Sequence, residues 1–231
     1  MLSPLLYAVV GLALSAGLLW YLLITTEGVY LGRRVVIWLY DRYAKRYDRI
    51  KGFDPEWESK RLGEPLCEVL EDIFEPLILD VGTGSGRLPL ALLRESHFSG
   101  LVVGVDLSWN MLKAATERLT AEGNPPSVQL IYAPAERLPF PDDLFDAVSC
   151  LEVLEFLTDQ HAVIAELVRV LRPGGVLLVT NRKGRSARLL PGKTQSAAAL
   201  AARLNQQGMV GVEVKIWQVL YDQVWSFKGD V

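Results

Sequence analysis

Two kinds of hydrophobic pattern alternate along the chain after residue 76. Short apolar runs typical of buried strands occur at 77–81, 101–105, 128–132, 144–150, 174–180, 211–217 and 219–226. Between most of them, apolar residues recur at helical spacing over 86–95, 109–122, 159–171 and 195–207. Strands that alternate with helices form parallel sheets, so the pattern predicts an α/β fold with a doubly wound, mostly parallel seven-stranded sheet. The last two runs leave no room for a helix between them, so we expect a C-terminal antiparallel hairpin.

The N-terminal pattern is different, because the 21 residues from Pro4 to Ile24 carry no charge. A helix of that length spans about 31 Å, which is the thickness of a bilayer core. Trp20 and Tyr21 lie near one end, where an aromatic belt is expected. A cleaved signal peptide would begin with basic residues and have a shorter apolar run, and a buried core helix is a further alternative. We therefore predict an N-terminal transmembrane helix, with residues 1–27 as the anchor.

The basic residues near this segment predict its orientation. Seven of them follow the anchor and none precedes it: Arg33, Arg34, Arg42, Lys45, Arg46, Arg49 and Lys51. By the positive-inside rule, the rest of the chain then lies in the cytoplasm. The two cysteines, Cys67 and Cys150, suit a reducing compartment. The sequence thus predicts a single-pass membrane protein with a cytoplasmic domain.

Residues 33–50 have the pattern of an amphipathic helix. One stripe is apolar or aromatic, and the opposite face carries charges such as Arg34, Asp41 and Arg49. Such a helix could pack on the domain, lie at an anionic membrane surface or cover an active site. We assign residues 28–75 to amphipathic or lid helices and residues 76–231 to the main domain.

Composition and charge narrow the possible functions. The net charge of −3 argues against a general nucleic-acid binder, although basic flanks surround an acidic middle. Two His and two Cys argue against zinc or haem sites, so we expect no metal. The stretch 181–194 after the fifth strand is basic, which suits a solvated loop, a cover over the acceptor site or a contact with anionic lipid.

The most informative stretch joins the first strand to the next helix. Asp80 lies in the strand, and Gly82, Gly84 and Gly86 follow it. Glycine permits positive φ and lets a ligand approach the backbone closely, and the helix start offers free N–H groups. The next strand ends in Asp106, whose carboxylate could accept hydrogen bonds from a ribose diol or cap the following helix. A tight turn without a ligand is the alternative for the glycines.

With these residues, the chain resembles the class I S-adenosylmethionine-dependent methyltransferases. The resemblance rests on L-D-V-G-T-G-S-G-R at 79–87, G-V-D-L-S at 104–108, the stretch 135–148 and L-R-P-G-G at 171–175. Upstream, Tyr40-Asp41, Ala44 and Tyr47-Asp48 resemble the opening of the ubiquinone and menaquinone methyltransferase group. The resemblance covers roughly residues 40–226 and implies a Rossmann-like methyltransferase sheet with S-adenosylmethionine as the cofactor.

The resemblance also implies roles for individual residues. Asp106 would hold the ribose hydroxyls, and Leu107 and Met111 would pack on adenine. Ala135 and Glu136 would meet the adenine edge, although Pro134 stands where the family often has Asp. The methionine part and the methyl group would lie near Asp80, Gly82, Thr83, Gly84, Gly86 and Cys150.

The sequence assigns no catalytic base. Methyl transfer needs an aligned nucleophile, and a base only where the acceptor must lose a proton. Glu152 and Glu155, after the fourth strand, and Tyr47, from the lid helix, are candidates. Solvent exposure is the alternative for both glutamates.

The function we expect is methyl transfer from S-adenosylmethionine to a small hydrophobic or membrane-associated acceptor, such as a quinone precursor or a lipid. Membrane contact is expected through the N-terminal helix and the basic flank, and no nucleic acid is expected as a partner. The alternative is a membrane-tethered assembly or scaffold protein that keeps the fold without catalysis. Another group-transfer enzyme of the same fold, such as an aminopropyl transferase, is a third reading.

Overall fold

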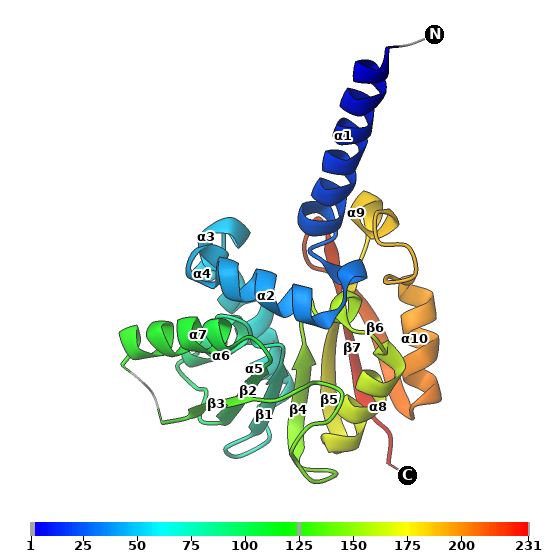
Figure 1. The fold of residues 1–231 in the computed structure, drawn as a ribbon. Helices are drawn as coiled ribbons and strands as arrows, with labels where there is room; N and C mark the ends of the chain where they lie inside the picture. The colour runs from blue at the N-terminus through cyan, green and yellow to red at the C-terminus, as the bar shows by residue number, and fades with distance from the viewer. Residues whose placement is uncertain (1–2, 124–125, 231) are drawn as a thin grey trace.

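The structure, a computed structural model, describes residues 3–123 and 126–230. Its centre is a seven-stranded sheet in the order β3-β2-β1-β4-β5-β7-β6 (Figure 1). All pairs from β3 to β5 are parallel, and β7 is antiparallel to both β5 and β6. The predicted doubly wound sheet and C-terminal hairpin are confirmed. The strands are β1 Leu77–Val81, β2 Leu101–Asp106, β3 Val128–Tyr132, β4 Phe145–Cys150, β5 Leu171–Arg182, β6 Met209–Ile216 and β7 Tyr221–Lys228.

Alternate residues of the strands pack on opposite faces of the sheet. Leu79 and Val81 belong to a core with the helices that follow β4 and β5, whereas Ile78 faces the helices before and after β1. This alternation is the period-2 geometry of a strand with both faces buried. The helices from β1 onward are α6 Arg87–Leu93, α7 Trp109–Ala121, η5 Leu154–Phe156, α8 Gln160–Val170, α9 Gly184–Arg188 and α10 Ala197–Gln206.

The segment predicted as one amphipathic helix over 33–50 is broken. It forms α2 Arg33–Tyr43, a single 3-10 turn η3 Ala44–Arg46 and α3 Tyr47–Lys51. The break turns Asp48 toward Ser85 and Arg118, which both hydrogen-bond to its carboxylate. Tertiary contacts therefore override the continuous helical pattern. The remaining N-terminal elements are η2 Val29–Leu31, α4 Pro55–Glu58, η4 Ser59–Gly63 and α5 Glu64–Val69.

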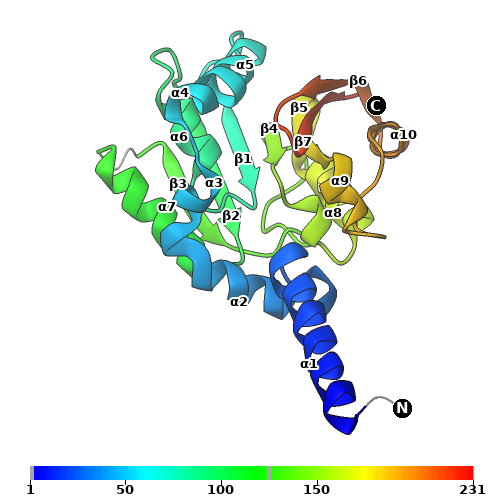
Figure 2. The ribbon, with the colours of Figure 1, turned by 90° about the horizontal axis from the view of Figure 1, so that it is seen from above.

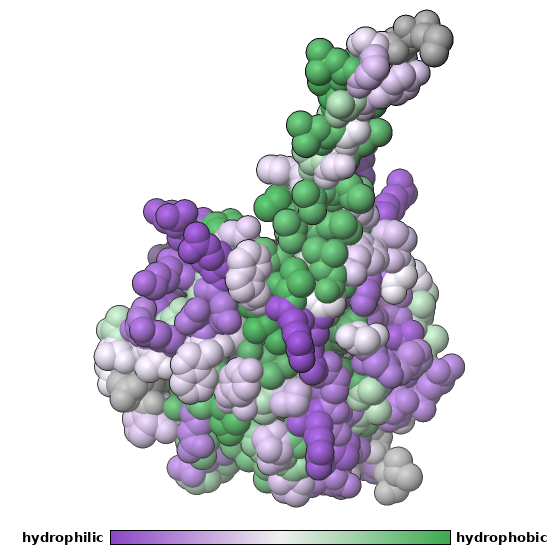
Figure 3. All heavy atoms as spheres, viewed as in Figure 1, coloured by the Kyte–Doolittle hydropathy of each residue, from purple (hydrophilic) through white to green (hydrophobic). Residues whose placement is uncertain are grey.

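The apolar N-terminal segment forms a helix that extends away from the domain. Helix α1, Pro4–Trp20, continues as the wider turn η1, Tyr21–Thr25. Ser3 caps its first turn and Pro4 stands at the first helical position, as is common at helix starts. Its length and composition suit a membrane span, although signal sequences have the same properties. The domain buries none of the most apolar 18 residues of this helix. Figure 3 shows the apolar surface of α1 continuing onto the domain at its base.

Figures 1 and 2 show how these parts meet at one end of the sheet. Helix α2 lies across the end where β1, β2 and β4 finish, and α1 rises from the same end. Two hydrogen bonds join the base of α1 to the basic loop after β5. The Tyr21 hydroxyl donates to the Leu189 carbonyl at 2.7 Å, and the Tyr30 hydroxyl to the Pro191 carbonyl at 2.8 Å.

Candidate functional site

The turn after β1 has the backbone geometry that its glycines predict. Gly82, Gly84 and Gly86 have φ values of 73°, 54° and 83°, which L-residues with side chains rarely adopt. A Cβ atom on Gly82 would lie 2.3 Å from a methyl carbon of Val153. The amide of Gly82 donates to the Val105 carbonyl at 2.7 Å, which fixes the turn to β2. These contacts fix the conformation of the turn at the cleft that lies above it.

Asp106 joins this turn to the end of β2. Its carboxylate accepts hydrogen bonds from the amides of Gly84, at 2.9 Å, and Ser108, at 2.8 Å. A carboxylate offers about four acceptor positions, so it retains capacity for a ligand diol. Burial raises the pKa of the Asp106 carboxyl above its ordinary value, while the backbone amides act in the opposite direction.

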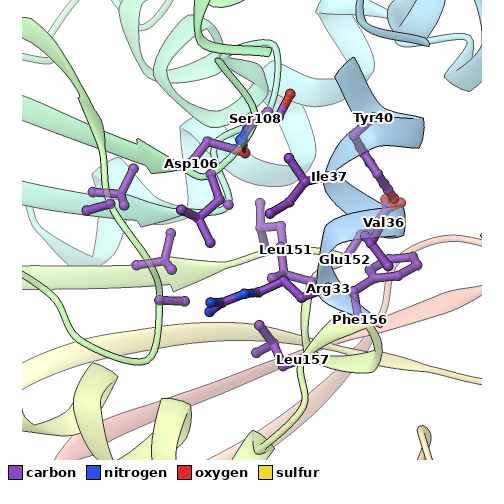
Figure 4. A pocket seen from close by; sticks show the side chains of 18 of the residues that line it. Arg33, Val36, Ile37, Tyr40, Asp106, Ser108, Leu151, Glu152, Phe156 and Leu157 are labelled. Carbon is purple, nitrogen blue, oxygen red and sulfur yellow. Dashed lines mark hydrogen bonds between the residues drawn. The ribbon is translucent and has the colours of Figure 1, made fainter. Parts of the chain in front are cut away.

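A cleft lies over these strand ends, beneath α2 (Figure 4). Its volume is about 810 Å³, including the part open to solvent. One wall consists of strand-end residues and the other of side chains from α2 and from the loop after β4. The lining includes Arg33, Val36, Ile37, Tyr40, Tyr47, Gly82, Gly84, Asp106, Leu107, Ala133, Ala135, Glu136, Leu151, Glu152, Phe156 and Leu157.

Two aspartates hold the lid helices over this cleft. Asp41 accepts hydrogen bonds from the Ser108 hydroxyl at 2.6 Å and the Asn110 amide at 3.1 Å. Asp48 pairs with Arg118 at 3.3 Å and accepts from the Ser85 hydroxyl. The sequence offered the repeated Tyr-Asp pair as a signal, but only the fold shows that both aspartates fasten the lid to the β1 turn and to α7.

A second contact joins α2 to the loop after β3 at the cleft. Arg33 of α2 pairs with Glu136 at 3.4 Å, and both residues line the cleft. The related motif often has Asp at the position of Pro134. Glu136, two residues later, is the acidic side chain nearest to that position in the sequence. Its carboxylate can accept from the edge of a base while Arg33 contacts it from the lid.

Glu152 is buried within a network of charges, so its predicted alternative of solvent exposure is wrong. Its carboxylate accepts from Lys51 at 2.9 Å and from Arg87 at 2.7 Å, and Arg87 also binds both oxygens of Glu58 at 2.7 Å. Burial acts to raise the pKa of the Glu152 carboxyl, but Lys51 and Arg87 outweigh it and hold that pKa below its ordinary value. A carboxylate stabilised in this way is a poor proton acceptor.

The guanidinium of Arg87 also lies between two aromatic rings. The ring centroids of Phe53 and Trp217 each lie 4.4 Å from the guanidinium carbon. Contacts of this kind between a cation and an aromatic ring stabilise the charge. Arg87 stands at the position where a dinucleotide-binding turn would have its third glycine. Here it forms the centre of an ion network between the lid, the β1 turn and the loop after β4.

Glu155 is also buried, so the alternative that this side chain is exposed to solvent is wrong as well. It accepts a hydrogen bond from the Tyr221 hydroxyl and one from Arg182 at 3.4 Å. Burial raises the pKa of its carboxyl above the ordinary value, although Tyr221 and Arg182 act in the opposite direction. Glu155 does not line the cleft. Tyr47 does line it, and burial raises the pKa of its phenol, so this hydroxyl stays protonated at neutral pH.

The remaining candidates divide by position. Asp80 and Thr83 line a smaller cavity beside the cleft, together with Gly82 and Gly84. Asp80 accepts from Ser149 at 2.6 Å, and burial raises the pKa of its carboxyl to about 6. The structure does not bring Gly86, Met111 or Cys150 to the lining of either space.

Burial and backbone conformation explain these three positions. Met111 and Cys150 are fully buried in the hydrophobic interior. A Cβ atom on Gly86 would meet Ala115 of α7 at 3.4 Å, an ordinary contact distance, so its φ of 83° rather than a lack of space favours glycine there. These residues can affect a ligand only through the elements that they support.

The residues present fit S-adenosylmethionine. The Asp106 carboxylate lines the cleft, where it can accept hydrogen bonds from a diol. Leu107, Ala133 and Leu151 give the cleft apolar surface for a flat ring. The glycine turn leaves room for a ligand, since a Cβ atom on Gly84 would meet no other atom closer than 3.9 Å.

Comparisons with known proteins agree with this geometry. Residues 79–179 match the family model described as "Methyltransferase domain". The ubiquinone/menaquinone biosynthesis C-methyltransferase UbiE of Marinomonas sp. is 38% identical over 102 residues, which are 44% of this chain and 41% of that protein. The protein of the same name from Azotobacter vinelandii is 37% identical over 124 residues, or 54% and 49% of the two chains. The chain thus aligns with less than half of the length of these relatives.

Solved structures share the fold. A SAM-dependent methyltransferase from Aquifex aeolicus superposes with a TM-score of 0.59 at 23% identity, over 76% of this chain and 99% of the other. The [4+2]-cyclase SpnF superposes with a TM-score of 0.62 at 21% identity, over 74% of this chain and 82% of the other. At these identities the likeness concerns the fold alone.

Proposed function

Because this chain contains a class I S-adenosylmethionine-dependent methyltransferase domain, we propose that it methylates a small lipophilic acceptor such as a quinone precursor or a lipid. One observation carries the proposal. The cleft that holds the Asp106 carboxylate is bordered by Val36 and Ile37 of α2, and α2 leads back along the chain to the exposed apolar helix α1. The names of the UbiE relatives support a quinone-type acceptor.

The residues of this chain act by binding, orientation and exclusion of water. S-adenosylmethionine, when bound, supplies a methyl group on a positively charged sulfur, which becomes a neutral thioether as the methyl group leaves. The Asp41 and Asp48 contacts keep the lid closed over the reacting groups. Lys51 and Arg87 keep Glu152 ionised and fixed in place beside the cleft. Holding two reactants in line can lower the barrier by about 7–11 kcal/mol.

Membrane attachment is the second part of the proposal. Helix α1 and the turn η1 would cross the bilayer, and the basic residues of α2 and α9 would face anionic headgroups at its cytoplasmic surface. Hydrogen bonds from Tyr21 and Tyr30 to the loop after α9 support this arrangement, because they hold the basic loop at the base of α1. Leu12→Arg should lower the fraction that resists alkaline extraction from membranes. An unchanged fraction would contradict a spanning helix.

The first experiment is calorimetric titration of the full chain in detergent with S-adenosylmethionine and S-adenosylhomocysteine. Asp106→Ala should weaken binding of both ligands by about tenfold or more, the loss of hydrogen bonds to a charged acceptor. Asp142→Ala is the matched control, since Asp142 is 70% exposed and lies outside the cleft. A folded chain that binds neither ligand would refute the proposal.

The second experiment measures transfer of a labelled methyl group to lipophilic and water-soluble acceptors. Naphthols, quinols and phospholipids in mixed micelles represent the first class, and catechol and glycine represent the second. Transfer to the first class only is the expected result. Transfer to water-soluble acceptors alone would overturn the lipophilic assignment. Cofactor binding without transfer to any acceptor would favour the scaffold reading.

A further inference from the structure

One buried cation beside the cleft has few partners. Arg182, the last residue of β5, has a side chain that is only 10% exposed. Across residues 3–123 and 126–230, its guanidinium donates one hydrogen bond, to Glu155 at 3.4 Å, and its buried Nε atom has no partner. A guanidinium has five N–H donors, and buried donors are normally satisfied. The unused donors of Arg182 therefore indicate a place for an oxygen-bearing group.

Arg182 does not line the cleft itself but is linked to it through neighbouring residues. Thr180 is two residues earlier in β5, so both side chains lie on the same face of the sheet. The Thr180 hydroxyl accepts from the amide of Glu152 at 2.7 Å, and Glu152 lines the cleft. Glu155, the partner of Arg182, precedes Phe156, which also lines the cleft. This edge, where parallel strands end, is where such sheets bind ligands.

The second anion near Arg182 comes from the segment that joins α1 to the lid. Glu27 lies 3.9 Å from the guanidinium, is 34% exposed and accepts from the Tyr40 hydroxyl at 2.9 Å. Its φ of 50° is in the left-handed region, which is unfavourable for a residue other than glycine. A carboxylate that is 3.9 Å from the guanidinium, partly exposed and on a strained backbone can be replaced by an oxygen that lies closer. Tyr40 is itself a cleft residue, so its bond to Glu27 links this partner to the cleft.

We propose that Arg182 binds an acidic oxygen of the methyl acceptor, a phenolate or a carboxylate on an aromatic ring. Glu27 occupies this place until the acceptor enters beside Tyr40 and Phe156, whose rings pack edge to face with centroids 5.6 Å apart and must separate to admit it. The acceptor oxygen then takes the unused N–H groups of Arg182. The inference rests on the proposed function, because it concerns the acceptor of that reaction. It selects aromatic acids and phenols among lipophilic acceptors. A phenol held by Arg182 is bound as its anion, with its proton released to solvent, and the negative charge makes the ring carbons more electron-rich.

The test uses three probes of similar shape with the full chain in detergent. These are 2-naphthol, 3-hydroxy-2-naphthoate and the neutral 2-methoxynaphthalene, titrated by fluorescence with a micelle blank. Arg182→Gln should weaken the two acidic probes by about tenfold and leave the ether unchanged. Bound 2-naphthol should show the red-shifted absorption of its anion in the native chain and lose that absorption in the variant.

Glu27→Gln separates a binding role from a structural role. If Glu27 only holds the fold together, its loss weakens all probes or lowers the unfolding temperature without improving the affinity of any probe. If it stands in for the acceptor oxygen, both acidic probes bind several-fold more tightly. Lys183→Gln is the control, since Lys183 follows Arg182 in sequence but pairs with Asp222. It should leave all three affinities unchanged.

The outcomes are distinct. Equal effects of Arg182→Gln on acidic and neutral probes, or weaker acidic binding in Glu27→Gln, overturn the inference. If the naphthoate binds more tightly and bound 2-naphthol shows no anion absorption, the acceptor oxygen is a carboxylate. If bound 2-naphthol shows the anion absorption and the naphthoate is not preferred, it is a phenolate. If Arg182→Gln does not fold, Arg182→Lys replaces it, because lysine keeps the positive charge. The change in acidic-probe affinity in Glu27→Gln then still tests the inference. These titrations need no methyl transfer, and S-adenosylhomocysteine binding in the same samples tests the proposed function separately.

Discussion

Arg87 offers the sharpest test of the ion network at the site. Its side chain is 10% exposed and holds two buried carboxylates, Glu58 and Glu152, whose side chains are 6% and 7% exposed. Arg87→Met keeps much of the side-chain volume between Phe53 and Trp217 but removes the charge. Removing one partner of a buried ion pair costs about 3–5 kcal/mol, because the other charge remains buried without compensation. For a chain of this length that loss lowers Tm by about 6–20 °C.

The pH dependence gives this prediction a sign. Glu152 in the native chain has a lowered pKa, so its contribution to stability is present above its unfolded pKa and is lost as pH falls. In Arg87→Met, Glu58 loses the arginine that opposes its burial, so its carboxyl pKa, already above the ordinary value, rises further. Glu152 keeps Lys51 but loses Arg87, so its pKa rises from its lowered value. The variant then loses stability as pH rises through the folded pKa of Glu58. The stability difference between the two proteins should therefore be larger at pH 8 than at pH 5.

The assay is urea unfolding of the full chain in detergent, followed by circular dichroism at both pH values. Arg94→Met is the matched control, because Arg94 is near the end of the same helix and pairs with Glu122 on the surface at 2.9 Å. Such exposed pairs contribute about 0–1 kcal/mol. A loss in Arg87→Met no larger than in Arg94→Met would refute the reasoning, as would a deficit that grows on acidification.

Three further predictions follow from the turn, the lid and the buried acid. Gly82→Ala places a methyl group 2.3 Å from Val153 at a φ of 73°, so it should lower Tm and abolish S-adenosylhomocysteine binding. Gly192→Ala, with the same φ but open space around it, should cost only the backbone strain of about 1–2 kcal/mol. Asp41→Ala removes the contacts of the lid with Ser108 and Asn110, and stopped-flow measurement should show cofactor dissociation about tenfold faster, whereas an unchanged rate would mean that the lid does not limit release. Because the folded pKa of Asp80 is raised to about 6, its contribution to stability is largest at low pH and falls between about pH 4 and 6. Asp80→Asn should flatten that part of the pH–stability curve, and an identical slope in both proteins would contradict the assignment.

The fold and the cofactor end of the site follow from local sequence. Strand and helix patterns are short-range properties, and the predicted sheet with its antiparallel hairpin is confirmed. The glycines of the β1 turn adopt the positive φ values that their sequence permits, and Asp106 stands at a strand end beside them. Such features depend on residues close together in the chain, so a single sequence determines them.

Tertiary structure decided which charges are buried and what they contact. Glu152 and Glu155 stand in the same short segment, yet one is held by Lys51 and Arg87 and the other by Tyr221 and Arg182. Lys51 and Glu152 are 101 positions apart, and no local pattern reports such a pair. Burial depends on how separate elements pack, and a buried charge is stable only where the fold brings a partner to it. The sequence therefore determined the scaffold and the cofactor turn, while packing decided the lid contacts, the ion network and the environment of Arg182.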